Sequence, residues 1–339
     1  MIDNPIFITG CYRSGTTYIS RVLDSHPDLN ITFDSVNYFR FIIKKNIPAN
    51  DYQNIVKSIS ERMKKRYNII LGSKKIVNNI EKSNVITHQV IYSKIMESLF
   101  NYSKKIWGEK TLLEWSNIPI FLSMFPKGQV IHIIRDPRDV LASYKNMTYE
   151  KGDRYLDAIF ASLGSLNASI HYSNALPSNR YKILIYEDFI LNTTVACKDL
   201  CEFLTIEFTD EMLDGKNYKD IFGKKFDPKT HTSFPNEDRK PINRWKKKLS
   251  NDEIGLTEAL VGSQMTHFGY ELSTNINNNS LVWIVDILNN NSLIKDRFIN
   301  FIESGEGIES YPSDSTDPKN WAVDTGIRGQ GASKAYGKN

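Results

Sequence analysis

The sequence predicts an α/β protein with a parallel β-sheet flanked by helices. Three short and largely apolar runs, at 6–8, 130–134 and 182–185, have the composition of buried parallel strands. The first run leads directly into a small polar loop and then an amphipathic helix, which is the order found in phosphate-binding α/β proteins. Ligands of such sheets bind where the strands end, so we expect the functional residues at that edge.

Length and composition are those of a soluble globular protein. The chain has 339 residues, of which 40% are hydrophobic and 24% charged, enough for one large domain or two small ones. The net charge of +4 is mild, and no zinc spacing or basic helix accompanies it, so we expect no nucleic-acid partner. Three cysteines are too few for a disulfide framework, and Cys197 and Cys201 favour a buried pair over a metal pair.

The N-terminal residues MIDNPIF carry neither a basic nor an apolar leader region. No stretch approaches the roughly 20 apolar residues that a membrane-spanning helix needs. These features favour a cytoplasmic protein without a membrane span, and the abundance of Asn, Lys and Ile would suit a bacterial, AT-rich genome.

We expect a main domain over residues 1–272 with a helical insert at about 41–100. Within the insert Ile55, Ile59 and Met63 recur at helical spacing, and lysines occupy the other faces. Those lysines form either a solvated surface, which we prefer, or a basic wall that faces an anionic acceptor.

Residues 273–339 are expected to form a C-terminal extension. The segment 275–291, with its two NNNSL runs, has the composition of a linker. From Ser304 onward Gly, Ser, Asp and Pro dominate, so we expect this part to be loosely packed or disordered.

The loop from Gly10 to Thr17 is the strongest candidate for a phosphate site. Its spacing G-x4-G-T-T nearly fits the phosphate-loop pattern G-x4-G-K-[ST], but Thr16 stands where that pattern has lysine. Arg13, inside the loop, supplies a cation instead. The N–H groups and the dipole of the following helix suit an anion. The alternative is a plain glycine turn between a strand and a helix.

A second candidate anion site follows the expected strand at 130–134. Arg135 stands at the end of this strand, and Asp136 and Pro137 have the N-cap and N1 positions of a helix. Ser143 lies eight residues after Arg135, about two helical turns into the helix, so both side chains can meet one anion. The alternative is a capped helix with a surface arginine. It would explain Asp136 and Pro137, but it gives no reason for Arg135 and Ser143 to occur together.

Further candidate residues follow other expected strands. Asp34 comes directly after a possible strand at 29–33. It is either a functional residue of the site or a residue that caps a turn or helix. Glu109 and Lys110 form either a functional pair or an ordinary surface ion pair. Tyr186 directly follows the expected strand at 182–185.

A long loop at 217–236 precedes Arg239 and Lys240. It contains few apolar residues, and long ordered loops are often functional lids.

In this order the motifs resemble those of sulfotransferases that use 3′-phosphoadenosine-5′-phosphosulfate (PAPS). The bacterial and tyrosylprotein branches carry R-S-G-T-T, which residues 13–17 match. Bacterial members have a glutamate after H-P-D, where this chain has Asp34, and E-K-T-P, where residues 109–112 are E-K-T-L. Soluble members carry R-K-G and then a G-x-W-K-like segment. Residues 239–246 match both, except that Pro241 and Asn243 stand in place of the two glycines. The resemblance covers about residues 5–270 and implies the P-loop-like sulfotransferase fold.

The resemblance implies that PAPS is the cosubstrate, that its product is PAP, and that no metal is required. The loop would hold the 5′-phosphosulfate, the strand-end arginine and helix serine would hold the 3′-phosphate, and the tyrosine of Y-E-D would lie near the adenine. The implied nucleotide-binding residues are Arg13, Ser14, Gly15, Thr16, Thr17, Arg135, Ser143, Tyr186, Arg239 and Lys240.

The implied reaction is transfer of a sulfuryl group to a hydroxyl or amine, with a small-molecule natural product or a carbohydrate as the acceptor that we favour. Such a catalyst positions the groups in line and neutralises charge on the leaving oxygen. Arg13 and Lys110 are the candidates for neutralisation, and Asp34 is the leading candidate base. Glu109 and His132 are alternative bases, although His132 lies inside an expected strand and would pack in the core.

Two other functions share parts of this pattern. A nucleoside or nucleotide kinase would use the same loop, but Thr16 replaces its lysine and no strand clearly ends in a magnesium-binding aspartate. A non-catalytic nucleotide-binding module is the third possibility. A nucleotide with phosphates at both its 5′ and 3′ positions accounts for two anion sites, whereas an ordinary NTP accounts for one.

Overall fold

The computed structural model describes residues 4–103, 105–147, 152–214, 219–221, 242–273 and 278–311. Two predicted nucleotide ligands, Arg239 and Lys240, lie outside these residues, as does most of the predicted lid at 217–236.

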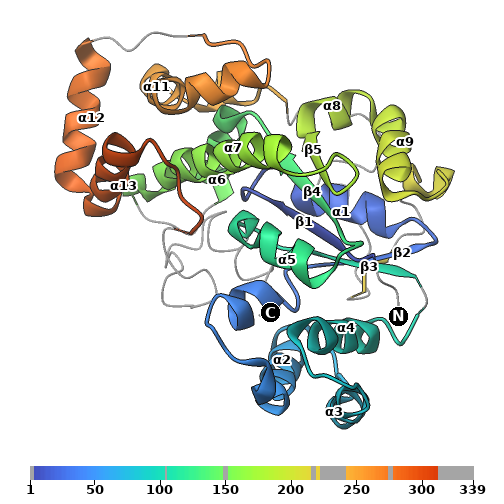
Figure 1. Cartoon of the computed structure of the whole chain (residues 1–339). Helices are drawn as coiled ribbons and strands as arrows, with labels where there is room; N and C mark the ends of the chain where they lie inside the picture. Colours follow the sequence, from blue (N-terminus) through green and yellow to red (C-terminus); the bar gives the residue numbers. More distant parts are fainter. Residues whose placement is uncertain are drawn as a thin grey trace.

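Five parallel strands form the central sheet, in the order β2-β3-β1-β4-β5 (Figure 1). The strands are β1 (Ile6–Gly10), β2 (Leu29–Phe33), β3 (Ile106–Lys110), β4 (Gln129–Ile134) and β5 (Tyr181–Ile185). β1 is central, since its Ile6 pairs with Gly108 of β3 and with Gln129 of β4. Because all five strands run in one direction, their carboxyl ends share one edge. The predicted parallel sheet is confirmed.

Helices cover both faces of the sheet. Successive residues of a strand point to opposite faces, so Ile6 and Ile8 of β1 enter one core and Phe7 enters the other. The first core is covered by α1 (Thr16–Asp24), α8 (Tyr186–Leu191) and α9 (Thr193–Leu204). The second is covered by the insert and by α5 (Ile118–Met124), α6 (Pro137–Met147), α7 (Asp157–Ala175) and α11 (Asn251–His267).

Shorter helices connect these elements. They are η2 (Ala49–Asp51), η3 (Trp115–Asn117), η4 (Gly152–Leu156), η5 (Asp210–Met212) and α10 (Trp245–Lys248). In the described part of the chain no helix is both long enough and apolar enough to span a membrane.

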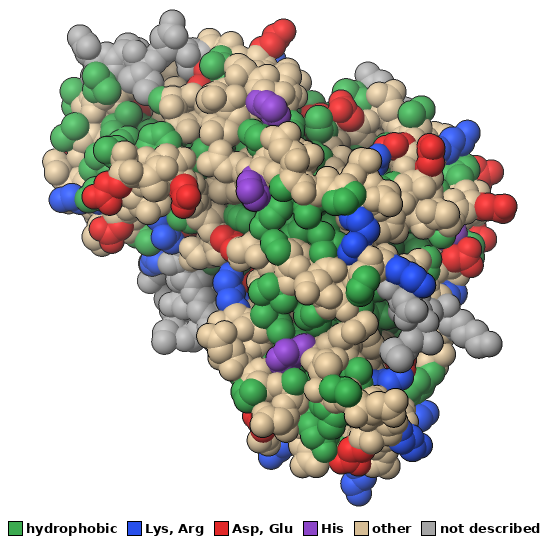
Figure 2. Space-filling model, in the orientation of Figure 1, with side chains coloured by type: hydrophobic (Ala, Val, Ile, Leu, Met, Phe, Trp, Pro, Cys, Tyr) green, Lys and Arg blue, Asp and Glu red, His purple; other side chains and the backbone are tan. Residues whose placement is uncertain are grey.

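The insert is helical, as predicted. It contains the short π-helix η1 (Phe39–Ile43) and the helices α2 (Tyr52–Tyr67), α3 (Ser73–Glu81) and α4 (His88–Leu99). Ile55, Ile59 and Met63 of α2 are buried, whereas its Lys57, Lys64 and Lys65 are exposed. Figure 2 shows Lys and Arg side chains along the rim of the insert, at the bottom of the view, which fits the solvated surface that we preferred.

The C-terminal extension is more ordered than its composition indicates. The expected linker at 275–291 is wrong, because α12 (Asn278–Asn290) occupies most of it and α13 (Ser292–Ser304) follows. Ile284 and Ile287 recur at helical spacing and are buried. The second polar run supplies a helix cap rather than a linker, since the side chain of Asn291 accepts the N–H of Ile294 at 3.3 Å. Residues 305–311 also pack against the domain, and 312–339 lie outside the described residues.

Candidate active site

The predicted phosphate loop runs from the end of β1 to the start of α1. Its turn is closed by Ser14, whose hydroxyl and N–H both donate to the carbonyl oxygen of Cys11, at 2.5 and 3.3 Å. Gly15 precedes α1 with φ +85°, and no side chain caps this helix end. The first N–H groups of α1 therefore have no side-chain acceptor and can bind an anion.

Gly15 is required for packing as well as for its backbone conformation. A Cβ atom at this position would overlap the ring of Tyr186, and the left-handed conformation already disfavours any other residue. Tyr186 is buried directly after β5, as the first residue of α8, and its ring centroid lies 4.6 Å from the guanidinium carbon of Arg135. One aromatic ring thus joins the phosphate loop to the second predicted anion site.

Three guanidinium groups gather around the loop. The Nε of Arg13 donates to the hydroxyl of Ser143 at 3.0 Å, and Nη1 of Arg135 donates to the carbonyl oxygen of Arg13 at 2.8 Å. Burial, together with repulsion from Arg135 and Arg244, lowers the pKa of Arg13 to about 10. Clustered like charges of this kind are stabilised by a bound anion.

Glu187 of α8 positions Arg135 next to the start of α6. Glu187 accepts the N–H of Asp136 at 3.0 Å and the hydroxyl of Tyr270 at 2.8 Å, and its carboxylate lies 4.0 Å from Nε of Arg135. Burial raises the pKa of Glu187 to about 7. These contacts fix the direction in which Arg135 leaves the end of β4.

A neighbouring set of contacts anchors the segment that carries Arg244. The carboxylate of Asp139 accepts the N–H groups of Asn243 and Trp245 at 2.8 and 3.0 Å. The guanidinium of Arg138 lies 4.0 Å from the ring of Trp245. The segment 242–246 is therefore held beside α6.

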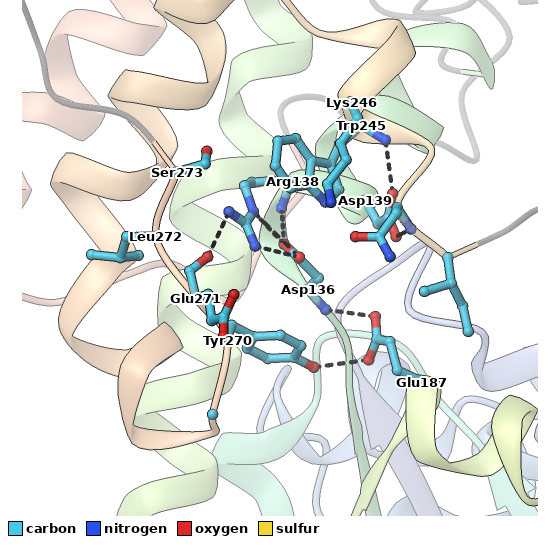
Figure 3. A pocket seen from close by; sticks show the side chains of 13 residues that line it. Asp136, Arg138, Asp139, Glu187, Trp245, Lys246, Tyr270, Glu271, Leu272 and Ser273 are labelled. Carbon is cyan, nitrogen blue, oxygen red and sulfur yellow. Dashed lines mark hydrogen bonds and ion pairs between the residues drawn. The ribbon is translucent and has the colours of Figure 1, made fainter.

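Arg138 itself is held by ion pairs, at 2.8 Å with Asp136 and at 2.7 Å with Glu258 of α11. The side chains of this region line a cavity of about 380 Å³. Figure 3 shows how they lie around it. Sequence reasoning missed Arg244, Glu258 and Tyr270. The only sequence signal for these residues was Asp139. It occupies the N3 position of α6, but its carboxylate binds the backbone of the segment 242–246 that carries Arg244.

Asp34 and Lys110 meet at the ends of β2 and β3. The ammonium group of Lys110 donates to the carboxylate of Asp34, and the N–H of Asp34 donates to the carbonyl oxygen of Lys110 at 2.9 Å. The two side chains differ in exposure, because that of Lys110 is 1% exposed and that of Asp34 is 42% exposed. Asp34 is thus the partner that an incoming molecule can reach.

Glu109 points away from this pair, into the interior of the insert. Its carboxylate accepts the N–H of Asn37 at 2.8 Å and the hydroxyl of Tyr92 at 2.7 Å. Burial raises the pKa of Glu109. These contacts suit a residue that supports the segment after β2 more than one that exchanges a proton with a substrate.

His132 is a core residue, as expected. Its ring nitrogens hydrogen-bond to the hydroxyls of Tyr181 and Ser165 at 2.8 and 2.9 Å, and burial lowers its pKa to about 3. Cys197 and Cys201 are buried and unpaired with one another, as the sequence indicates. Among the described residues no three His, Cys, Asp or Glu side chains gather as a metal site would require.

The structure brings the described site residues to one edge of the sheet. Arg13, Arg135 and Ser143 are joined by hydrogen bonds, and the ring of Tyr186 contacts Arg135. Ser14 and Gly15 belong to the same loop as Arg13, and Thr16 is the first residue of α1. Thr17 follows in the first turn of α1. These features define an α/β protein in which a phosphate-loop-like turn joins β1 to α1.

The chain belongs to the sulfotransferase family. The model of that family matches residues 5–210, which is more than half of the chain. This confirms the family indicated by the motifs, while its bacterial and tyrosylprotein branches are not distinguished.

Two solved structures have the same fold. The sulfotransferase domain of the olefin synthase from Synechococcus PCC 7002 aligns with a TM-score of 0.57 and 20% identity, over 80% of this chain and 97% of that one. The sulfotransferase domain from the curacin biosynthetic pathway aligns with a TM-score of 0.55 and 18% identity, over 80% of this chain and 99% of that one. No curated protein matches the sequence.

Proposed function

We propose that this protein transfers a sulfuryl group from PAPS to a hydroxyl or amine of a small-molecule or carbohydrate acceptor. The observation that carries the proposal is the convergence of two anion-binding motifs. Arg13 of the phosphate loop donates to Ser143 of α6, and Arg135 donates back to the loop. A nucleotide with phosphates at both its 5′ and 3′ positions uses both motifs, whereas an ordinary NTP uses one.

The residues present fit such a nucleotide. The uncapped start of α1 offers N–H groups to a 5′-phosphate, and the cluster of Arg13, Arg135 and Arg244 provides positive charge that repels itself without an anion. Tyr186 lies between the two motifs, where an aromatic ring can contact a base or ribose. Arg239 and Lys240 would add further charge at the 3′-phosphate.

PAPS supplies the sulfuryl group when bound, and the chain supplies position and charge. Arg13 would neutralise the charge that develops on the leaving oxygen, with Lys110 as its partner. The exposed carboxylate of Asp34 would accept the acceptor's proton, and its ion pair with Lys110 holds it in place. We assign Glu109 to positioning, because it binds the segment that follows Asp34.

Calorimetric titration with adenosine 3′,5′-bisphosphate (PAP) tests the proposal. We expect tight binding that does not depend on magnesium, with ADP and with ATP plus magnesium as matched comparisons. Preference for ATP with magnesium would contradict the proposal and favour a kinase. Equal, weak binding of all three nucleotides would favour a plain phosphate-binding loop.

A further inference from the structure

Residues 305–311, which we call the C-terminal strap, leave the end of α13 and run along the surface of α7 (Figure 1). Gly307 of the strap lies against the backbone of Gly164, so closely that a Cβ atom would overlap it. The N–H of Ile308 donates to the carbonyl oxygen of Phe160 at 3.0 Å. The strap therefore has one defined path across this helix.

Glu309 ties the strap to the region between the sheet and the insert. Its carboxylate accepts the N–H of Ser116 at 2.8 Å and lies 3.7 Å from the ammonium group of Lys44. Arg297 of α13 donates to the hydroxyl of Ser310 at 3.1 Å. These polar contacts place the next residue, Tyr311, against the phosphate loop.

The ring of Tyr311 contacts one residue of the phosphate loop and one of the insert, and we call the space that this ring occupies the slot. Its ring stacks on that of Tyr12, with centroids 5.1 Å apart and an interplanar angle of 16°. The guanidinium of Arg40 lies 5.4 Å from the centroid of the same ring. Tyr12 is supported in turn by Tyr144, whose ring centroid is 4.4 Å away. The slot thus offers an aromatic face and a cation to a flat ring.

The slot is next to the proposed reaction centre. Tyr12 directly precedes Arg13, and the hydroxyl of Tyr311 interacts electrostatically with the Arg13 guanidinium. The hydroxyl of Tyr12 is buried and has no hydrogen-bond partner within the described part of the chain. On the insert side, Arg62 stacks on Phe41 at 4.4 Å and donates to the carbonyl oxygen of Asp34.

We propose that this slot is an aromatic subsite for the acceptor, and that Tyr311 fills it as a built-in competitor. The inference rests on the proposed function and narrows its acceptor to a phenol or similar aryl alcohol. A flat ring in the slot gains stacking on Tyr12 and a cation–π contact with Arg40. A linear aliphatic alcohol gains neither of these contacts. Tyr311 shows the fit, because it is itself a phenol and its ring stacks on Tyr12, the residue before Arg13.

Calorimetric titration of 2-naphthol into the PAP-saturated full-length protein tests the subsite. Removal of the competing ring in Tyr311→Ala should tighten 2-naphthol binding at least about threefold, whereas Tyr311→Phe should bind as wild type does. Tyr52→Ala, which removes a tyrosine of α2, is the matched control and should change nothing. Adding Arg40→Gln to Tyr311→Ala should cancel the gain, and 1-hexanol should gain nothing in any variant.

Equal 2-naphthol affinity in wild type and Tyr311→Ala, or no binding to either, would overturn the subsite. An equal gain for 1-hexanol would also overturn it, because the slot would then not select aromatic rings. The PAP titration is read separately, since loss of PAP binding contradicts the proposed function. In that event 2-naphthol is titrated into the protein without nucleotide, and the comparison of variants still decides the subsite.

Discussion

Arg13 and Asp34 both follow a strand, and both have a backbone conformation that is uncommon for residues other than glycine. Their φ angles are +66° and +52°, which costs on the order of 1 kcal/mol each. Hydrogen bonds hold both residues in place. Arg135 binds the carbonyl oxygen of Arg13, and Tyr67 donates to the carbonyl oxygen of Asp34 at 2.6 Å. The conformations are thus maintained by contacts from other elements.

Asp34→Asn should lower turnover of PAPS much more than it lowers affinity for PAP. An amide keeps the shape of the side chain and can still contact Lys110, but it cannot accept a proton. General-base catalysis contributes about 10²–10⁴-fold, so kcat should fall by about 100-fold or more while the Kd for PAP stays within about threefold. Steady-state kinetics, with an acceptor that wild type turns over, and calorimetry measure the two quantities. A change in affinity alone would make Asp34 a structural residue, and Asp51→Asn controls for the substitution itself.

Gly15→Ala should weaken PAP binding by about tenfold or more, and Gly269→Ala should not. Both glycines have a positive φ, +85° and +80°, so both variants carry a similar backbone cost. Only at Gly15 would the new methyl group meet an obstacle, the ring of Tyr186, whereas nothing lies within 4 Å at Gly269. Titration of both variants with PAP measures the difference. Similar losses in the two would show that the packing of Tyr186 on the loop does not shape the site.

At the scale of elements, the start of α6 organises the site. Asp136 binds Arg138, Asp139 binds the backbone of 242–246, and Glu187 of α8 binds the N–H of Asp136. Four elements (β4, α6, α8 and α10) therefore meet around one helix end. Buried polar networks of this kind fix one arrangement when each member is satisfied.

The carboxyl group of Glu187 makes part of the folding stability dependent on pH. Burial raises its pKa from the ordinary 4.5 to about 7, so the folded state retains a proton that the unfolded state releases in this window. Its contribution is complete below about pH 4.5 and is lost as the pH rises through 7. Glu187→Gln removes this dependence.

Between pH 5 and pH 8 wild type should lose stability relative to Glu187→Gln, by up to about 3 kcal/mol for the full shift in pKa. Urea unfolding at both pH values measures this difference. Other groups with raised pKa values, such as Glu114 and Glu109, titrate in both proteins and cancel in the comparison. Parallel changes in the two proteins would contradict the assignment.

At the scale of the whole molecule, the parallel sheet assembles the site. Arg13, Asp34, Lys110, Arg135 and Tyr186 are spread over more than half the chain, and each stands at or just after the end of a different strand. Because the five strands are parallel, these ends meet at one edge. The positions of β1, β2, β4 and β5 and the order of the motifs were predicted from local apolar runs and short patterns, whereas no residue range was predicted for β3.

The amino-acid sequence by itself determined the strands, the phosphate loop, the capped start of α6 and the identities of the charged residues, since these depend on neighbours within a few positions. Tertiary structure decided which residues face one another. It placed Tyr186 on Gly15, Arg244 beside Arg13, and Glu109 in the interior. It also formed a helix pair and a strap from a C-terminal segment of loose composition, and it stacked Tyr311 of that strap on Tyr12. Those outcomes depend on packing between residues far apart in the chain, which no local pattern encodes.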